Sequence, residues 1–233
     1  AEGSQVFSDI WVNLPSQKGM ETEEIIQSAA DGNIDVLFLL GSDPLSDFYD
    51  PDLAEKALKM VGTVISVDLF VNPSAYHADI FFPASSFTEV TGSHTNTEGR
   101  ITPIRQKVTS PGTARPDWMI AAEIAHRLGH DLGIEKPEDI WNELNSRSIS
   151  HEQISFDSIA NSPDGQFINE SDAITLGNLE KISDTRPFDS YSLRLVLAKR
   201  MYDKGTITQM SPALQQFAGT SQLHINPSDF EAM

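Results

Sequence analysis

Cysteine is missing from the 233-residue chain. Without thiols the chain can form no disulfide, and it can supply no thiolate ligand to zinc or to an iron–sulfur cluster. If a larger protein that includes this sequence carries such clusters, their cysteine ligands lie outside this chain.

Basic residues are scarce: the chain has 16 Lys and Arg against 34 Asp and Glu, a net charge of −18 at pH 7. This charge repels nucleic acids and anionic membrane surfaces, so we expect no nucleic-acid partner. Long hydrophobic runs are missing too. The apolar run 36–40 is far shorter than the ~20 residues of a membrane helix. Residues 1–15 also lack the basic start and apolar centre of a signal peptide, and we expect no direct membrane insertion.

The pattern of apolar residues predicts an α/β fold. Amphipathic spacing and capping residues predict helices over 22–31, 52–61, 117–128 and 137–148. Short apolar runs predict strands over 36–40, 63–67 and 79–82. This alternation is typical of βαβ units, and we therefore expect an open parallel sheet with flanking helices and right-handed crossovers. The unbroken run Val36–Leu40 favours a strand that is covered on both faces.

Polar turn residues follow each of the three predicted strands, at 41–44, 68–72 and 83–86. Because ligands of open parallel sheets bind beyond the carboxyl ends of the strands, these turns form a candidate ligand-binding rim. The alternative is that the same Gly, Ser, Asp, Asn and Pro residues serve only the turns.

The polar stretch 92–100 is a second candidate site. The backbone near Gly99, the short side chain of Thr97 and the guanidinium of Arg100 are suitable donors to a phosphate or pyrophosphate. In the alternative interpretation, which the residues alone favour, this stretch is an ordered turn that Glu98 and Arg100 tie to the sheet.

Other chemical patterns are weak. Glu123 and His126 are three residues apart on a predicted helix, but a carboxylate-bridged metal site needs a second such helix. Asp47, Asp50 and Asp52 resemble part of a calcium loop, yet the glycine at the sixth position and the terminal glutamate are missing. The sequence contains no Gly-x-Ser-x-Gly elbow, no Gly-x-Gly-x-x-Gly fingerprint and no P-loop.

Composition changes after the predicted helices. Residues 151–190 carry eight acidic and two basic residues and show weak periodicity. We therefore divide the chain into an α/β domain over 1–149, an acidic irregular connector over 150–190 and a module over 191–233. Alternation at Tyr191–Leu197 predicts a strand that opens this last, β-rich module.

Four stretches resemble one family, the molybdopterin-dependent oxidoreductases. They read LFLLGSDPLSD, ISVDLFVNPSAYHADIFFPASSFTE, GSHTNTEGRI and PGTARPDWMIAAEIAHRLG. Within the family they look most like the large iron–sulfur subunit of bacterial NADH–quinone oxidoreductase, respiratory complex I. The resemblance implies that residues 1–149 correspond to the third domain of this fold, which helps to hold the guanine-dinucleotide tail of molybdopterin. It implies that residues 191–233 are the truncated start of the last, β-barrel-like, dinucleotide-binding domain.

The resemblance also implies which residues face the dinucleotide, whereas it assigns no catalytic or metal-binding residue to this chain. The residues that the resemblance implies are Gly41, Ser42, Asp43, Pro44 and Asp68. The donors of the polar stretch 92–100 complete the set of expected cofactor-binding residues, namely Thr97, Gly99 and Arg100. The implied cofactor is molybdopterin guanine dinucleotide, and iron–sulfur clusters belong to the rest of the parent protein.

Two functions follow from the resemblance. In the first, the chain is a fragment of the large iron–sulfur subunit and acts as a scaffold in the peripheral arm of complex I. Its partners are then other subunits of that arm, and it lies in the cytoplasm against the inner face of the cell membrane. In the alternative, the chain is the cofactor-binding part of a molybdopterin oxidoreductase such as formate dehydrogenase. A free-standing adaptor that reuses the fold is a third interpretation. In all of them we expect the fragment alone not to be catalytic, because it lacks ligands for an electron-carrying cofactor.

Overall fold

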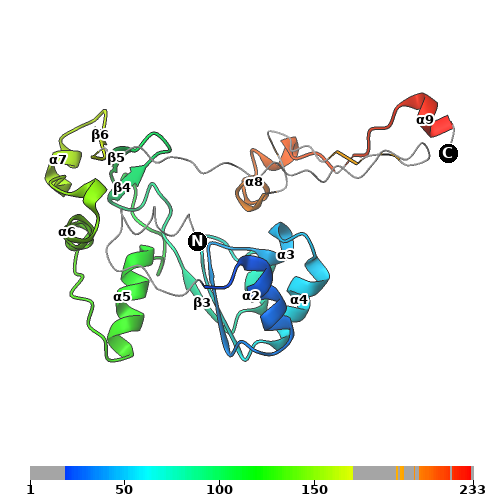
Figure 1. Ribbon diagram of the computed structural model, residues 1–233, viewed down its shortest axis with the longest axis horizontal. Coiled ribbons are helices and arrows are strands. Elements are labelled where there is room, and N and C mark those ends of the chain that lie inside the picture. Colours follow the sequence, from blue (N-terminus) through cyan, green and yellow to red (C-terminus); the bar gives the residue numbers. More distant parts are fainter. Residues whose placement is uncertain are drawn as a thin grey trace.

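The computed structural model describes residues 19–169, 193, 195–196, 202, 205–220 and 222–231 (Figure 1). Its α-helices are α2 (Thr22–Ala30), α3 (Pro44–Asp47), α4 (Pro51–Met60), α5 (Asp117–Arg127), α6 (Pro137–Arg147), α7 (Phe156–Ala160), α8 (Thr206–Met210) and α9 (Pro227–Glu231). The short 3-10 helices are η1 (Ser74–His77), η2 (Ile149–His151) and η3 (Gln215–Phe217). The strands are β1 (Val36–Leu40), β2 (Thr63–Asp68), β3 (Ile80–Pro83), β4 (Gly92–Thr95), β5 (Arg100–Ile104) and β6 (Gln166–Phe167).

Strands β1, β2 and β3 form a parallel sheet in that order. Phe38 lies opposite Ile65, which in turn lies opposite Ile80. The predicted α/β class and its parallel sheet are therefore confirmed. Helices α2 and α4 lie side by side and cover one face of this sheet (Figure 1).

Small residues allow these helices to lie close to the sheet. Ala29 of α2 and Ala57 of α4 are fully buried, and both belong to the same core as Leu37, Leu39 and Val64 of the strands. Burial of this apolar stripe stabilises the layer by about 25 cal/mol for each Å² removed from water. Apolar packing therefore holds the helices on the sheet.

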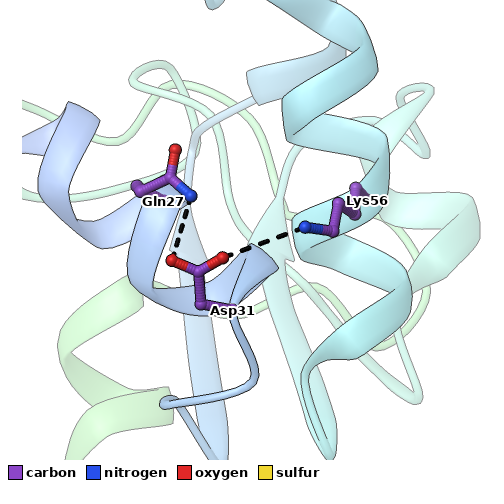
Figure 2. Close-up of polar contacts among 3 residues, drawn as sticks. All are labelled: Gln27, Asp31 and Lys56. Atoms are coloured by element: carbon purple, nitrogen blue, oxygen red, sulfur yellow. Dashed lines mark hydrogen bonds and ion pairs between the residues drawn. The ribbon is translucent and has the colours of Figure 1, made fainter.

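Polar contacts fix the ends of the two helices. Asp50 caps α4 by accepting a hydrogen bond from the Leu53 amide at 3.0 Å. Figure 2 shows Asp31 at the end of α2, where it accepts from Gln27 at 3.0 Å and lies 3.8 Å from the Lys56 ammonium of α4. Such an exposed ion pair contributes at most ~1 kcal/mol to the free energy of unfolding. Its main effect is therefore to orient the two helices.

The second face of β1 differs from the sequence prediction. Val36, Phe38 and Leu40 are 49%, 46% and 69% exposed, whereas Leu37 and Leu39 between them are buried. The prediction of a strand that is covered on both faces is therefore wrong for β1 in the described part of the chain. The strand is apolar throughout because helices cover one of its faces, while the side chains of its other face are apolar but exposed.

Residues 92–104 form a β-hairpin instead of a loop. Strands β4 and β5 pair antiparallel, and β6 adds to β5 to complete a small second sheet. In the turn, the Asn96 side-chain oxygen accepts from the amides of Glu98 at 2.9 Å and Arg100 at 3.0 Å. Gly99 adopts a φ of +77°, and a Cβ there would approach Ile168 to 2.9 Å. Glycine is therefore required at position 99 for backbone conformation and for space.

A second core lies beside this hairpin. Ile101 of β5 packs with Trp141 of α6, and with Ile154 and Ile159 that follow. The Trp141 indole N–H donates to the Ile154 carbonyl at 2.5 Å. Burial also lowers the pKa of His151, which is hydrogen-bonded to Ser148 at 2.7 Å.

This core corrects the interpretation of residues 150–190 as an irregular connector. Residues 150–169 contain α7 and β6 and supply buried side chains, because a few apolar residues there meet partners that are distant in sequence. Residues 170–190 lie outside the described part.

The predicted β-rich module over 191–233 is not seen in the part of that stretch that the structure describes. The predicted strand Tyr191–Leu197 falls largely outside the described residues, and its described positions 193, 195 and 196 are not in a strand. From residue 205 onward the described elements are the short helices α8, η3 and α9. The division of the chain into three domains stays a prediction.

None of the helices among the described residues is long and apolar enough to cross a bilayer.

Candidate functional site at the carboxyl edge of the parallel sheet

The loops that follow β1, β2 and β3 meet at one edge because the strands are parallel. They comprise residues 41–44, 68–75 and 83–86. The structure thus brings together the predicted residues Gly41, Ser42, Asp43, Pro44 and Asp68. We call this edge the carboxyl rim.

Asp43 does not face outward from the carboxyl rim. Its side chain is 2% exposed, and one carboxylate oxygen accepts from both the amide and the hydroxyl of Ser74, at 3.1 and 2.5 Å. The other oxygen accepts from the Ser46 hydroxyl at 2.7 Å. The Ser74 hydroxyl oxygen also accepts from the Leu45 amide at 3.0 Å. Asp43 therefore ties the loop after β1 to the loop after β2.

Asp68 is committed to its own loop in the same way. Its carboxylate accepts from the Leu69 amide at 2.6 Å and from the Asn72 side-chain amide at 2.9 Å. Asn72 is buried, and its side-chain oxygen accepts from the Ala75 amide at 2.8 Å. The two predicted carboxylates of the carboxyl rim therefore hold its shape.

Gly41 and Ser42 are among the exposed residues of the carboxyl rim. Gly41 has a φ of +56°, and a Cβ at this position would meet nothing within 4 Å. Its amide donates to the Val67 carbonyl at 2.9 Å, whereas the Ser42 amide donates to none of the described residues. A ligand can therefore approach the backbone closely here, and the Ser42 N–H is available to it.

Arg115 and Asp117 also belong to the carboxyl rim, although the sequence prediction left them out. The Arg115 amide donates to the Pro83 carbonyl at 3.1 Å, which places this residue at the end of β3. Its guanidinium is exposed and has no hydrogen bond or ion pair to the described residues. Burial raises the pKa of Asp117 above its ordinary value, and the nearby charge of Asp68 raises it further. The sequence pointed to Arg115 and Asp117 only through the ARPDW string before α5, which is one of the stretches that resemble the family.

A cavity of about 440 Å³ adjoins Arg115. Phe81, Phe82 and Pro83 of β3 line it on one side. Ile120, Ile124 and the Glu123–Arg127 ion pair of α5 line the other side. The walls are thus largely apolar, and Arg115 is the cation of this cavity that lacks a described carboxylate partner.

The structure does not bring the hairpin residues to the carboxyl rim. The Arg100 guanidinium donates to the Asp164 carbonyl at 3.1 Å and lies 4.2 Å from the centre of the Phe167 ring. None of the described hydrogen bonds joins Thr97, Gly99 or Arg100 to the carboxyl rim. This geometry is that of an ordered turn tied down by Arg100. A cofactor-binding role for these three residues stays a prediction.

Two residues of the remaining acidic and histidine patterns have structural partners. Glu123 forms an ion pair with Arg127 at 2.7 Å, and Asp50 is the cap of α4. Within the described residues, no group of three or more His, Asp or Glu side chains has the arrangement of a metal site.

Comparison with known proteins identifies the relatives of this chain. The family model described as molybdopterin oxidoreductase matches residues 4–127. The F420-dependent formate dehydrogenase subunit alpha of Methanocaldococcus jannaschii is 28% identical over 255 residues, which cover 100% of this chain and 38% of that protein. The assimilatory nitrate reductase catalytic subunit of Bacillus subtilis is 37% identical over 134 residues, which cover 57% of this chain and 19% of that protein.

Among solved structures, acetylene hydratase from Pelobacter acetylenicus has a similar fold. The TM-score is 0.53 at 20% identity, over 64% of this chain and 20% of the hydratase. The chain therefore spans well under half the length of these relatives. The expectation of the large iron–sulfur subunit of complex I is not supported, because the relatives are formate dehydrogenase and nitrate reductase subunits. Short motifs such as TNTEGR do not distinguish the complex I subunit from formate dehydrogenases.

Proposed function

The chain belongs to the molybdopterin oxidoreductase family, and on this premise we propose that it is part of a molybdopterin oxidoreductase of the formate dehydrogenase type. In this proposal the carboxyl rim holds the guanine-dinucleotide tail of the cofactor. The relatives support the formate dehydrogenase assignment, since several of them carry that name. The partners are then the rest of that enzyme instead of the peripheral arm of complex I. A cytoplasmic location stays a prediction.

The donors of the carboxyl rim fit a pyrophosphate. The Ser42 amide and the Arg115 guanidinium supply a hydrogen bond and positive charge, and the open space at Gly41 lets a phosphate approach the backbone. The ends of β1 and β3 are two strand spacings apart, about 10 Å, which suits an extended nucleotide better than a single phosphate. The observation that carries the proposal is the Arg115 guanidinium at this edge, which has no hydrogen bond or ion pair among the described residues.

Each residue of the carboxyl rim has a distinct role in this proposal. Arg115 neutralises phosphate charge, and the Ser42 N–H orients the phosphate. Asp43 and Asp68 keep the loops in place before the ligand arrives, which lowers the entropic cost of binding. The molybdenum–pterin group supplies the redox chemistry when it is bound, and this chain contributes binding and orientation.

Replacement of Arg115 tests the proposal. We expect R115A to weaken GDP binding to the 233-residue chain about tenfold or more, because a hydrogen bond to a charged group contributes roughly 1.5–3 kcal/mol. Isothermal titration calorimetry measures the change. The matched control is R147A, which removes the same charge from an exposed arginine paired with Glu143 on α6. Equal affinity of R115A and the unmodified chain would contradict the proposed role of Arg115.

A further inference from the structure

The short helix η1 begins in a buried polar site between the loops that follow β1 and β2. Ser74, its first residue, is fully buried, and Asn72, two residues earlier, is 1% exposed. Burial of a polar side chain is costly unless the side chain is hydrogen-bonded. The partners of Ser74 and Asn72 therefore indicate what these two residues do.

The first two amides of η1 are capped from two different loops. The Ser74 amide donates to the carboxylate of Asp43, which belongs to the loop after β1, at 3.1 Å. The Ala75 amide donates to the side-chain oxygen of Asn72, in the loop after β2, at 2.8 Å. Both loops therefore hold the start of η1.

The Ser74 hydroxyl links the same two loops a second time. It donates to Asp43 at 2.5 Å and accepts from the Leu45 amide at 3.0 Å, although Asp43 and Ser74 are 31 residues apart in the sequence. On the other side of η1, the side-chain amide of Asn72 donates to Asp68 at 2.9 Å. A network of hydrogen bonds thus runs from Asp43, through the backbone of η1, to Asp68.

This network ends next to the backbone that binds the phosphate in the proposed function. Ser42, whose amide donates to none of the described residues, directly precedes Asp43. The bonds that fix Asp43 therefore also fix the direction of the Ser42 N–H. A buried network whose members are all hydrogen-bonded makes a loop rigid, and a rigid loop loses less conformational entropy when a ligand binds.

We propose that Ser74 is a positioning residue for nucleotide binding: it touches no ligand, but it holds the loop after β1 so that the Ser42 N–H meets the phosphate. This role rests on the proposed function of the carboxyl rim. Without the Ser74 hydroxyl, Asp43 keeps its bonds to the Ser46 hydroxyl and to the amide of residue 74, but the Leu45 amide loses its acceptor. The loop then keeps its local turn and is held less firmly on η1.

Ser74→Ala in the 233-residue chain tests the proposal, and Ser66→Ala is the matched control. Ser66 is a fully buried serine of β2 whose hydroxyl has no hydrogen-bond partner among the described residues. We expect Ser74→Ala to weaken GDP binding about fivefold or more in isothermal titration calorimetry, because the ligand must then order a looser loop. Ser66→Ala should leave the affinity unchanged. Ser74→Cys weakens the same hydrogen bonds without removing the side chain, so it should give an intermediate affinity, and it is measured even if Ser74→Ala does not fold.

Amide hydrogen exchange separates positioning from a purely structural role. In Ser74→Ala we expect faster exchange at Ser46 and Asp47, whose amides donate to the Asp43 carbonyl, and slow exchange again at saturating GDP. A lower free energy of unfolding with unchanged GDP affinity would show that Ser74 only stabilises the fold, which would overturn the proposal. Equal weakening of GDP binding in Ser66→Ala would overturn it too. If the unmodified chain bound no GDP, the proposed function itself would be wrong, and the role of Ser74 would fall with it.

Discussion

Replacement of Asp43 by alanine is expected to lower the free energy of unfolding by about 3 kcal/mol. The change removes a buried carboxylate that accepts from Ser46 and twice from Ser74. The Ser74 amide and hydroxyl are then left in a buried site without this acceptor. Urea denaturation followed by circular dichroism measures the loss.

The matched control is Asp47→Ala. Asp47 is exposed, and its side chain forms no hydrogen bond or ion pair among the described residues. Its removal should change the free energy of unfolding by no more than about 0.5 kcal/mol. If both variants were equally stable, Asp43 would not organise the carboxyl rim.

Replacement of Trp141 by alanine should lower the free energy of unfolding by about 4 kcal/mol, because it leaves a cavity at the centre of the second core. Trp141 packs with Ile101 of the hairpin and with Ile159 of α7, and its indole N–H donates to the Ile154 carbonyl. Amide hydrogen exchange is expected to accelerate at β5 and β6 together, because one core holds both strands.

Leu128→Ala serves as the control for this variant. Leu128 is a large apolar residue just after α5, but it is 73% exposed. Its truncation should therefore lower the free energy of unfolding by less than about 0.5 kcal/mol. Faster exchange at β5 alone in the Trp141 variant, with β6 unchanged, would show that residues 150–169 are not part of this core.

The parallel sheet could be predicted from the sequence because its signals are local. The run Val36–Leu40 lies between two amphipathic helices, and turn residues such as Gly41 mark the strand end. The predicted strand 36–40 matches β1, and the predicted helix 117–128 differs from α5 by one residue. Which face of β1 is covered depends on segments elsewhere, and the local pattern does not contain that information.

The second sheet could not be predicted because its signals are not local. β5 pairs with β6 across more than sixty residues, Arg100 lying opposite Phe167. The hairpin strands are largely polar outside Ile101 and Ile104, and a two-residue strand such as β6 leaves no periodicity to detect. Apolar residues of 150–169 such as Ile159 become core residues only after this pairing.

The candidate site was predicted in position but not in side-chain orientation. The sequence correctly located Asp43 and Asp68 at the ends of parallel strands, but both carboxylates bind their own loops. A residue type indicates the chemistry that is available and does not indicate where the side chain points. Arg115 was missed because it lies far in sequence from β3 and rejoins the sheet only in the folded chain.

Nuclear magnetic resonance mapping of GDP on the ¹⁵N-labelled 233-residue chain tests the binding site most directly. We expect GDP to shift the amides of Gly41, Ser42 and Arg115 before those of Thr97 and Gly99 in the hairpin. Shifts confined to the hairpin, or no shift at the carboxyl rim up to millimolar GDP, would contradict this expectation.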